Sequence, residues 1–423
     1  MAFYYGKASS LRPGFEDHVL NIGIEIHQGV IMHQEDVCRI NPDVATIPMS
    51  KREAIWKAMH GRDNLANLAS GNPDMAMPQP VRNAMREHVA EGYARYTEYY
   101  GLKALREGIS SMLERDWSLP ADSEDQIIVT CGVQQGLYIV MRSILNPGDE
   151  VIIPSPHYGS YYQNTLACGA KPVLVPLAES DNFEPDFERL AAAVSTKSRA
   201  IVFCNPNNPL GVVWSHQTLK SLADFAQAHD LLVLVDEIYR DYTFNGPPLS
   251  VGSLPGMAQR TFTFGGFSKS HLMMGLRIGF VAGPPALMHA VKKLHYCVVL
   301  CPSAISQAAA SAALECTDAE LAPIRNHFAA QLDHLYRRVQ ALPGVSCAAP
   351  GGGFYVFPNF SRYGSDAMAF AIRLIEEAGV VTLPGTEFGE LGQGHLRLSV
   401  CAAEAEVSEG IQRLETFIHN QQD

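Results

Sequence analysis

The chain has 423 residues, too many for one ordinary domain, and this length favours a large domain with a smaller companion. Hydrophobic residues make up 47% and charged residues 18%, a balance that excludes a largely disordered chain and is typical of a folded globular protein. The formal net charge of −12 argues against a nucleic-acid groove, which needs a basic surface, so we expect a small-molecule or protein partner and no nucleic acid.

Nine cysteines are scattered along the chain with no C-x-x-C pair, a pattern that suggests neither a disulfide framework nor a zinc site. The first residues lack a basic segment followed by an apolar one, and no later stretch offers roughly 18 uncharged apolar residues. We therefore expect a cytoplasmic protein with no membrane segment.

Residues 1–63 show no sustained period apart from a helical pattern near residues 50–60, and we interpret them as an N-terminal arm. Residues 64–300 are interpreted as the large domain, with part of the N-terminal segment joining the smaller one. From about residue 126 its pattern is short apolar runs separated by helical segments, such as VQQGLYIVMRSIL and a helix that begins at Ser215. The runs predict buried strands of a largely parallel sheet and read QIIVT, DEVIIPSP, KPVLVPL, AIVFCNP, LLVLVDEIY, RTFTFGG and IGFVAG.

Residues 301–423 have a different pattern of predicted helices and strands, which indicates a small α+β domain. An Ala-rich helical stretch comes first, followed by GGGFYVFPNF, another helix and a final strand, HLRLSV. The complete pattern is an α/β protein in which loops at the carboxyl ends of the large-domain strands build the site.

The most informative segment is FGGFSKSHLMMGLRIGF, in which Lys269 follows a glycine-rich strand end and Arg277 lies eight residues later. A lysine in this place could form an imine, although taken alone it would most simply be a solvated surface lysine. His271, two residues after the lysine, could protonate an intermediate, but a packing role is the simpler interpretation.

A carboxylate ends the strand in LLVLVDEIYRDY, where Asp236 is followed three positions later by Tyr239. A buried carboxylate is costly unless it meets a cation, and a protonated pyridine nitrogen would be such a partner. The alternative is that Asp236 caps a helix.

Two turns follow other strands. FCNPNNPLG places Asn208 where its side-chain N–H could reach an oxygen, although the turn needs no function. TCGVQQG joins a strand end to a helix start, where Gly132, Val133 and Gln134 could bind a phosphate through backbone N–H groups and the helix dipole.

Two further side chains complete the set. Tyr158, in PSPHYGSYY, offers a flat face that could stack on an aromatic ring or simply pack in a half-buried position. Arg397 lies in the alternating strand HLRLSV; if it points inward it must pair with an anion, and its guanidinium suits a carboxylate.

Taken together and in this order, these six segments resemble the fold-type I aminotransferases that use pyridoxal phosphate (PLP), classes I and II of the aspartate aminotransferase superfamily. The resemblance covers about residues 65–415. It implies a large domain with a mostly parallel seven-stranded sheet between helices, plus a smaller α+β domain.

The resemblance also implies roles for the cofactor site. Lys269 would carry PLP as a Schiff base and move the substrate proton, with Asp236 on the pyridine nitrogen. Tyr239 and Asn208 would contact the phenolic oxygen of PLP, and Tyr158 would stack on its ring. The phosphate would be bound by Gly132, Val133, Gln134, Ser268 and Arg277.

Substrate and partner are implied in the same way. Arg397, with Asn208 and the backbone of Gly71, would bind the α-carboxylate of the substrate. Tyr96, in RYTEYYGLKALRE, matches a tyrosine that reaches the cofactor phosphate of the neighbouring subunit, so a homodimer with a shared site is expected. The histidines of the arm, His27, His33 and His60, lack metal-ligand spacing, and no metal site is expected.

These features predict an aminotransferase that moves the amino group of an L-amino acid to a 2-oxo acid by a ping-pong mechanism. Two departures keep an alternative open. Leu210 replaces the threonine usual before the glycine of the turn, and Gly266 replaces a phosphate-binding hydroxyl. The first is similar to a turn of relatives that perform eliminations or cyclisations. The alternative is therefore an enzyme of the same fold that catalyses elimination, cyclisation or oxidation of an amino acid in a specialised pathway. A regulator built on the same fold is disfavoured because no basic winged-helix segment precedes the match.

Overall fold

The computed structural model describes residues 40–92, 95–244, 246 and 248–421. The chain divides into two units, residues 1–48 and 49–423. The described part of the first unit contains one short helix, α3 (Pro42–Ala45), whose start is capped by the side chain of Asn41. Most of the predicted arm, residues 1–39 with His27 and His33, lies outside the described residues.

The second unit contains a seven-stranded sheet in the order β2-β8-β7-β6-β5-β3-β4. Its strands coincide with the seven predicted apolar runs: β2 (Ile127–Thr130), β3 (Glu150–Ser155), β4 (Lys171–Pro176), β5 (Ser198–Cys204), β6 (Leu232–Asp236), β7 (Thr261–Gly266) and β8 (Gly279–Ala282). Neighbouring strands from β4 through β7 run parallel, whereas β8 is antiparallel to both β7 and β2. The predicted mostly parallel sheet is therefore confirmed.

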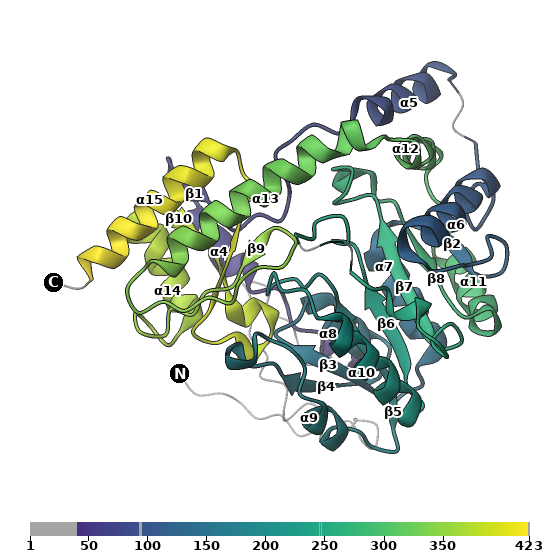
Figure 1. The fold of residues 1–423 in the computed structure, drawn as a ribbon, viewed down its shortest axis with the longest axis horizontal. Helices are drawn as coiled ribbons and strands as arrows, with labels where there is room; N and C mark the ends of the chain where they lie inside the picture. Colours follow the sequence, from purple (N-terminus) through teal and green to yellow (C-terminus); the bar gives the residue numbers. More distant parts are fainter. Residues whose placement is uncertain (1–39, 93–94, 245, 247, 422–423) are drawn as a thin grey trace, which may run out of the picture. The chain divides into compact units, whose positions relative to one another are not determined.

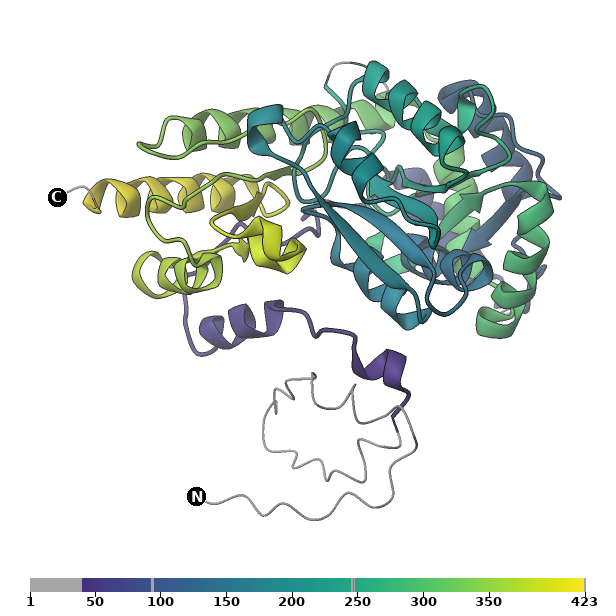
Figure 2. The same cartoon turned by 90° about the horizontal axis from the view of Figure 1, so that it is seen from below.

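Helices lie above and below these strands (Figures 1 and 2). They are α6 (Lys103–Trp117), α7 (Gly132–Ile144), α8 (Gly159–Ala167), α9 (Phe187–Ala192), α10 (His216–Ala228) and α11 (Pro285–Val299). Helix α12 (Ala304–Leu314) packs against α5 (Gln79–Ala90) and α6. The Ser215 side chain accepts a hydrogen bond from the Thr218 N–H and caps α10, as predicted.

The remaining elements form smaller sheets and their helices. They are α4 (Arg52–Met59), β1 (Ala66–Asn67), α13 (Asp318–Gln340), β9 (Tyr355–Val356), α14 (Ala367–Arg373), β10 (Val380–Val381), β11 (Leu383–Pro384), β12 (Leu396–Ser399) and α15 (Glu404–Asn420). Strand β1 pairs with β10, and β12 lies between β11 and β9. Helices α13 and α15 lie side by side (Figure 2). We keep the division into a large domain, 64–300, and a small domain, 301–423, as a proposal.

Sheet topology brings the informative segments to one edge. Strands β5, β6 and β7 are parallel, so the residues that follow them, including Asn208, Asp236 and Lys269, share their carboxyl-end edge. Because β8 is antiparallel to β7, Arg277 just before β8 comes to the same edge. Strand β2 is antiparallel to β8, and the turn after it, which opens α7, arrives there as well.

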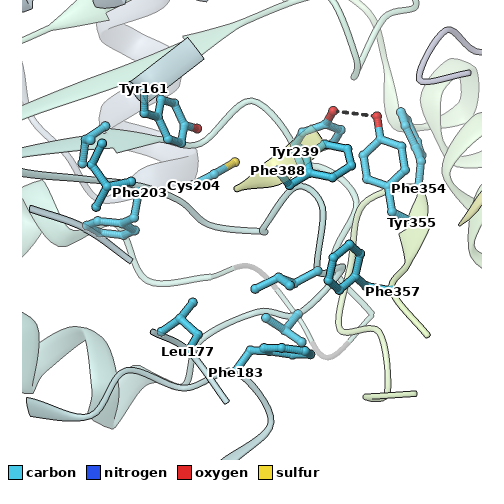
Figure 3. Packing of buried hydrophobic residues seen from close by; sticks show 14 of the residues in the cluster. Tyr161, Leu177, Phe183, Phe203, Cys204, Tyr239, Phe354, Tyr355, Phe357 and Phe388 are labelled. Atoms are coloured by element: carbon cyan, nitrogen blue, oxygen red, sulfur yellow. Dashed lines mark hydrogen bonds between the residues drawn. The ribbon is translucent and has the colours of Figure 1, made fainter. Parts of the chain in front are cut away.

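The packing beside this edge is continuous with the hydrophobic core. Figure 3 shows Tyr161 and Cys204, which come from the large-sheet layer, and Tyr355 and Phe388, which come from elements around the three-stranded sheet. All four side chains are buried in one cluster. Side chains of the site therefore sit on rigid, packed elements, which limits their rotamer freedom.

Candidate active site

A pocket of about 470 Å³ lies at this edge of the sheet. Its lining brings together residues that are far apart in the sequence, from Arg52 to Arg397. Eleven of the thirteen predicted site residues line it: Gly71, Val133, Gln134, Tyr158, Asn208, Asp236, Tyr239, Ser268, Lys269, Arg277 and Arg397.

Lys269 lies in the turn after β7, and its Nζ donates a hydrogen bond to the carbonyl oxygen of Gly71 at 2.8 Å. Burial lowers the pKa of this lysine to about 8, because a low-dielectric surrounding disfavours the ammonium form. Arg397 and Arg277 lower it further, while Cys401 and Asp236 act in the opposite direction. A substantial fraction of the amine is therefore neutral near physiological pH, the form that attacks a carbonyl carbon or accepts a proton.

Asp236 ends β6 and is 4% exposed. Its carboxylate accepts hydrogen bonds from the Tyr161 hydroxyl at 3.0 Å and from the backbone N–H of Ile238 at 3.1 Å. Burial nevertheless raises the pKa of Asp236 to about 6. The two hydrogen bonds oppose this shift but do not cancel it, so the carboxylate is a strong attractor for a cation in the pocket.

Arg397 lies on β12 and is 2% exposed. Its Nη1 donates to Asn208 Oδ1 at 3.0 Å and its Nη2 donates to the carbonyl oxygen of Ala69 at 2.7 Å. The Nε atom is buried and makes no hydrogen bond. Burial lowers the pKa of Arg397, and the unpaired N–H leaves the guanidinium able to bind an anion.

An anion cradle forms at the start of α7. Gly132 has a φ of +78°, and a Cβ at this position would lie 2.7 Å from Arg277 Nη2, so only glycine permits this close approach. The first N–H groups of a helix have no partner within it, and the helix dipole favours negative charge there. Val133, Gln134 and Ser268 line the pocket beside Arg277.

Tyr158 stands at the N-cap of α8 and is only partly buried. Its hydroxyl lies 3.5 Å from Gln134 Oε1, and its ring meets Tyr161 edge-on at 5.7 Å between centroids. One wall of the pocket is therefore an aromatic ring held between two neighbours.

Tyr239 presents its hydroxyl to Tyr355, with 3.0 Å between the two oxygens. Both side chains are almost fully buried. Burial raises the pKa of Tyr239 well above its usual value and that of Tyr355 to about 12, so both are neutral phenols across the physiological range.

Two residues considered in the sequence analysis, Tyr96 and His271, do not line the pocket. Tyr96 is 82% exposed and does not line the pocket; its expected contact is with another subunit, and that expectation stays a prediction. His271 is buried, packs against Phe267 and contacts Ser270 through Nδ1 at 2.8 Å. It is not among the lining residues, in agreement with a packing role.

Of the two departures from the family pattern, the structure explains Gly266 and gives no local reason for Leu210. Leu210 is buried and does not line the pocket, and its backbone N–H donates to Asn207 Oδ1 at 3.2 Å. A Cβ on Gly266 would come within 2.9 Å of the Cα of Gly279, so a hydroxyl-bearing side chain has no room there.

Tyr161, Tyr355 and Arg52 are among the pocket residues that the sequence interpretation missed. Tyr161 lies three positions after Tyr158 at the start of α8, and that spacing could have indicated a shared face. Tyr355 was visible in FYVF but was assigned only to a strand. Nothing in the sequence around Arg52 distinguishes it from a surface arginine.

The described residues contain no cluster of three or more His, Cys, Asp or Glu side chains arranged to hold a metal ion. Nor does any helix in that part of the chain have the length and apolarity to cross a membrane.

Fold and pocket together define an α/β enzyme whose buried lysine, carboxylate, anion cradle and arginine converge at the carboxyl edge of a parallel sheet. A model of the family described as aminotransferase class I and II matches residues 63–414. The chain belongs to this family and is an aminotransferase.

Similar proteins and solved structures are also aminotransferases. The chain is 36% identical over 347 residues to an arginine–pyruvate transaminase of Pseudomonas aeruginosa, covering 82% of this chain and 88% of that protein. It is 32% identical to an aromatic-amino-acid aminotransferase of Thermococcus litoralis, covering 87% and 95%. A solved aspartate aminotransferase from Thermus thermophilus with maleate superposes with a TM-score of 0.84 at 32% identity, covering 89% and 99%.

Proposed function

We propose that the protein uses PLP bound at Lys269 to move the amino group of an L-amino acid to a 2-oxo acid by a ping-pong mechanism. One observation carries the proposal: a buried lysine of lowered pKa shares a pocket with a buried carboxylate, an anion cradle and an arginine with an unpaired N–H.

The pocket residues fit PLP group by group. Arg277, Ser268 and the start of α7 suit its phosphate, because they combine a guanidinium, a hydroxyl and free N–H groups. Asp236, whose raised pKa reflects a buried charge without a close cation, suits the pyridine nitrogen. When bound, PLP supplies a carbonyl carbon that captures the amine and a ring that accepts electrons.

Further contacts would hold the ring in place. The flat face of Tyr158 suits stacking on it. The side chains of Tyr239 and Asn208 line the same pocket and suit its phenolic oxygen as hydrogen-bond donors.

Arg397 binds the α-carboxylate of the substrate in this scheme, assisted by Asn208 and the backbone of Gly71. Two parallel N–H···O bonds fix the orientation of a carboxylate, which directs the substrate Cα–H bond toward Lys269. The Nζ of Lys269 then takes the proton from Cα and later returns it, and its lowered pKa suits both steps.

The functional unit proposed is a cytoplasmic homodimer in which Tyr96 reaches the phosphate site of the partner subunit. The high exposure of this tyrosine supports the assignment, because a large aromatic side chain that is 82% exposed is available for a contact with another chain.

The experiment uses the PLP-loaded protein and one equivalent of a candidate amino acid without an acceptor. Amino-group transfer should leave pyridoxamine phosphate and a 2-oxo acid, both detectable by mass spectrometry. An enzyme of elimination, cyclisation or oxidation would instead turn over repeatedly without acceptor and without pyridoxamine phosphate. That outcome would overturn transamination.

A further inference from the structure

Tyr355 contacts both halves of the candidate site. It lies on β9, is 1% exposed, and its hydroxyl oxygen is 3.0 Å from that of Tyr239 (Figure 3). The face of the same ring lies 4.1 Å from the guanidinium carbon of Arg397. One side chain therefore touches the residue proposed for the phenolic oxygen of PLP and the residue proposed for the substrate α-carboxylate.

The surrounding backbone leaves room for this hydroxyl. A Cβ on Gly71 would lie 2.5 Å from the Tyr355 hydroxyl oxygen, so that position must be glycine when residue 355 is tyrosine. The carbonyl oxygen of the same glycine accepts the hydrogen bond from Lys269 at 2.8 Å. The Tyr355 hydroxyl thus lies beside Tyr239 and Gly71, while its ring lies against Arg397.

A neutral phenol has one proton to donate and lone pairs to accept with. If the Tyr239 hydroxyl donates its hydrogen bond to a ligand oxygen in the pocket, its single proton is used. The Tyr239 oxygen can then only accept a hydrogen bond, and the donor must be a neighbouring group. The Tyr355 hydroxyl is at hydrogen-bond distance to be that donor. Buried hydrogen bonds arranged in series strengthen one another, and a fixed donor also fixes the direction of the next one.

We propose that Tyr355 is a positioning residue: its hydroxyl orients the Tyr239 hydroxyl toward the bound cofactor, while its ring supports the Arg397 guanidinium. The inference rests on the function proposed above and adds to it a physical connection between substrate carboxylate binding and the cofactor. Removing only the hydroxyl and removing the whole ring should therefore have different effects.

The first variant, Tyr355→Phe, keeps the ring under Arg397 and removes the hydroxyl. A weaker hydrogen bond from Tyr239 leaves more negative charge on the phenolic oxygen and favours protonation of the bound cofactor. The pH midpoint of the visible absorption change should rise by about half to one pH unit, the size expected for one neutral hydrogen bond. The kcat should fall about three- to tenfold while the KM for the amino acid stays nearly unchanged.

The second variant, Tyr355→Leu, also removes the aromatic face, so the KM for the amino acid should rise in addition. Tyr239→Phe removes the proposed hydrogen bond to the phenolic oxygen completely. It should therefore give the largest shift of the spectral pH midpoint. Tyr363→Phe is the matched control, because it removes another hydroxyl from the same part of the chain, one that donates to the Pro343 carbonyl oxygen and does not line the pocket.

Replacing Tyr355 by 3-fluorotyrosine keeps the fold and strengthens the donor, and it should move the spectral midpoint in the opposite direction. An unchanged midpoint in both Tyr355→Phe and the fluorotyrosine protein, with a normal shift in Tyr239→Phe, would overturn the inference alone. If the unmodified protein binds PLP without any visible absorption change on Lys269, the proposed function fails and this inference fails with it.

Discussion

The hydroxyl of Tyr161 donates a 3.0 Å hydrogen bond to Asp236 Oδ2, and both side chains are buried. This contact stabilises the carboxylate form in a place where burial opposes it. Tyr161, which also lines the pocket, therefore influences the charge of Asp236, and this relationship can be tested directly.

Tyr161→Phe should raise the pKa of Asp236, because a hydrogen bond to the charged form is lost. The acidic limb of the kcat profile against pH should move to higher pH, and kcat at neutral pH should fall about tenfold, as expected for one hydrogen bond to a charged group. Steady-state kinetics from pH 5 to 9 measure both effects. A profile that keeps its shape while activity falls would mean that Tyr161 only packs.

Asp236→Asn should separate stability from activity in the cofactor-free protein. The folded-state pKa of Asp236, about 6, lies above its ordinary value of 3.8, so the folded state binds the proton more tightly. This contribution to stability is full below pH 3.8 and is lost as pH rises through about 6, a total of about 3 kcal/mol. An asparagine side chain does not ionise, so the folded protein does not lose this stability as the pH rises.

Urea unfolding of the cofactor-free protein should therefore show Asp236→Asn more stable than the parent at pH 7.5, with the difference shrinking toward pH 5. The same variant should lose activity by a factor of about a thousand or more when loaded with PLP, because the ring nitrogen loses its countercharge. Near-normal turnover would assign the pyridine partner to another residue.

Lys269→Ala should abolish both turnover and the covalent attachment of PLP. Borohydride reduction of the loaded parent protein should fix the label to the peptide containing Lys269. The pKa of about 8 also predicts that covalent capture of PLP by the cofactor-free protein becomes faster as pH rises toward 8, because the neutral amine is the nucleophile. Stopped-flow absorption measures that rate, and label on a different lysine would contradict the assignment.

Arg397→Lys should not restore function, since an ammonium cannot reproduce two parallel hydrogen bonds to a carboxylate. The expected loss in kcat/KM for amino acids is about a hundredfold. Amines without a carboxylate serve as the control and should lose little. If kcat/KM falls equally for amino acids and for amines without a carboxylate, Arg397 has a structural role, through its hydrogen bonds to Asn208 and Ala69.

The sequence by itself was enough to predict the seven strands, the helix near residues 50–60 and the cap at Ser215. Short apolar runs bounded by Gly, Pro or Asn are typical of buried strands, and a serine before a helical pattern is a preferred helix N-cap. The polar residues at the ends of those runs were visible for the same reason: a charged or amide side chain after a buried strand contrasts with its neighbours.

Tertiary structure alone decided which side chains support those residues. Tyr161 meets Asp236 across 75 positions, and Tyr355 meets Tyr239 across 116. No local period marks such pairs, because each tyrosine also fits its own helix or strand as an ordinary packing residue. The antiparallel direction of β8, which brings Arg277 to the edge of the sheet where the pocket lies, is likewise decided by the tertiary structure. An apolar run in the sequence does not indicate the direction of the neighbouring strands.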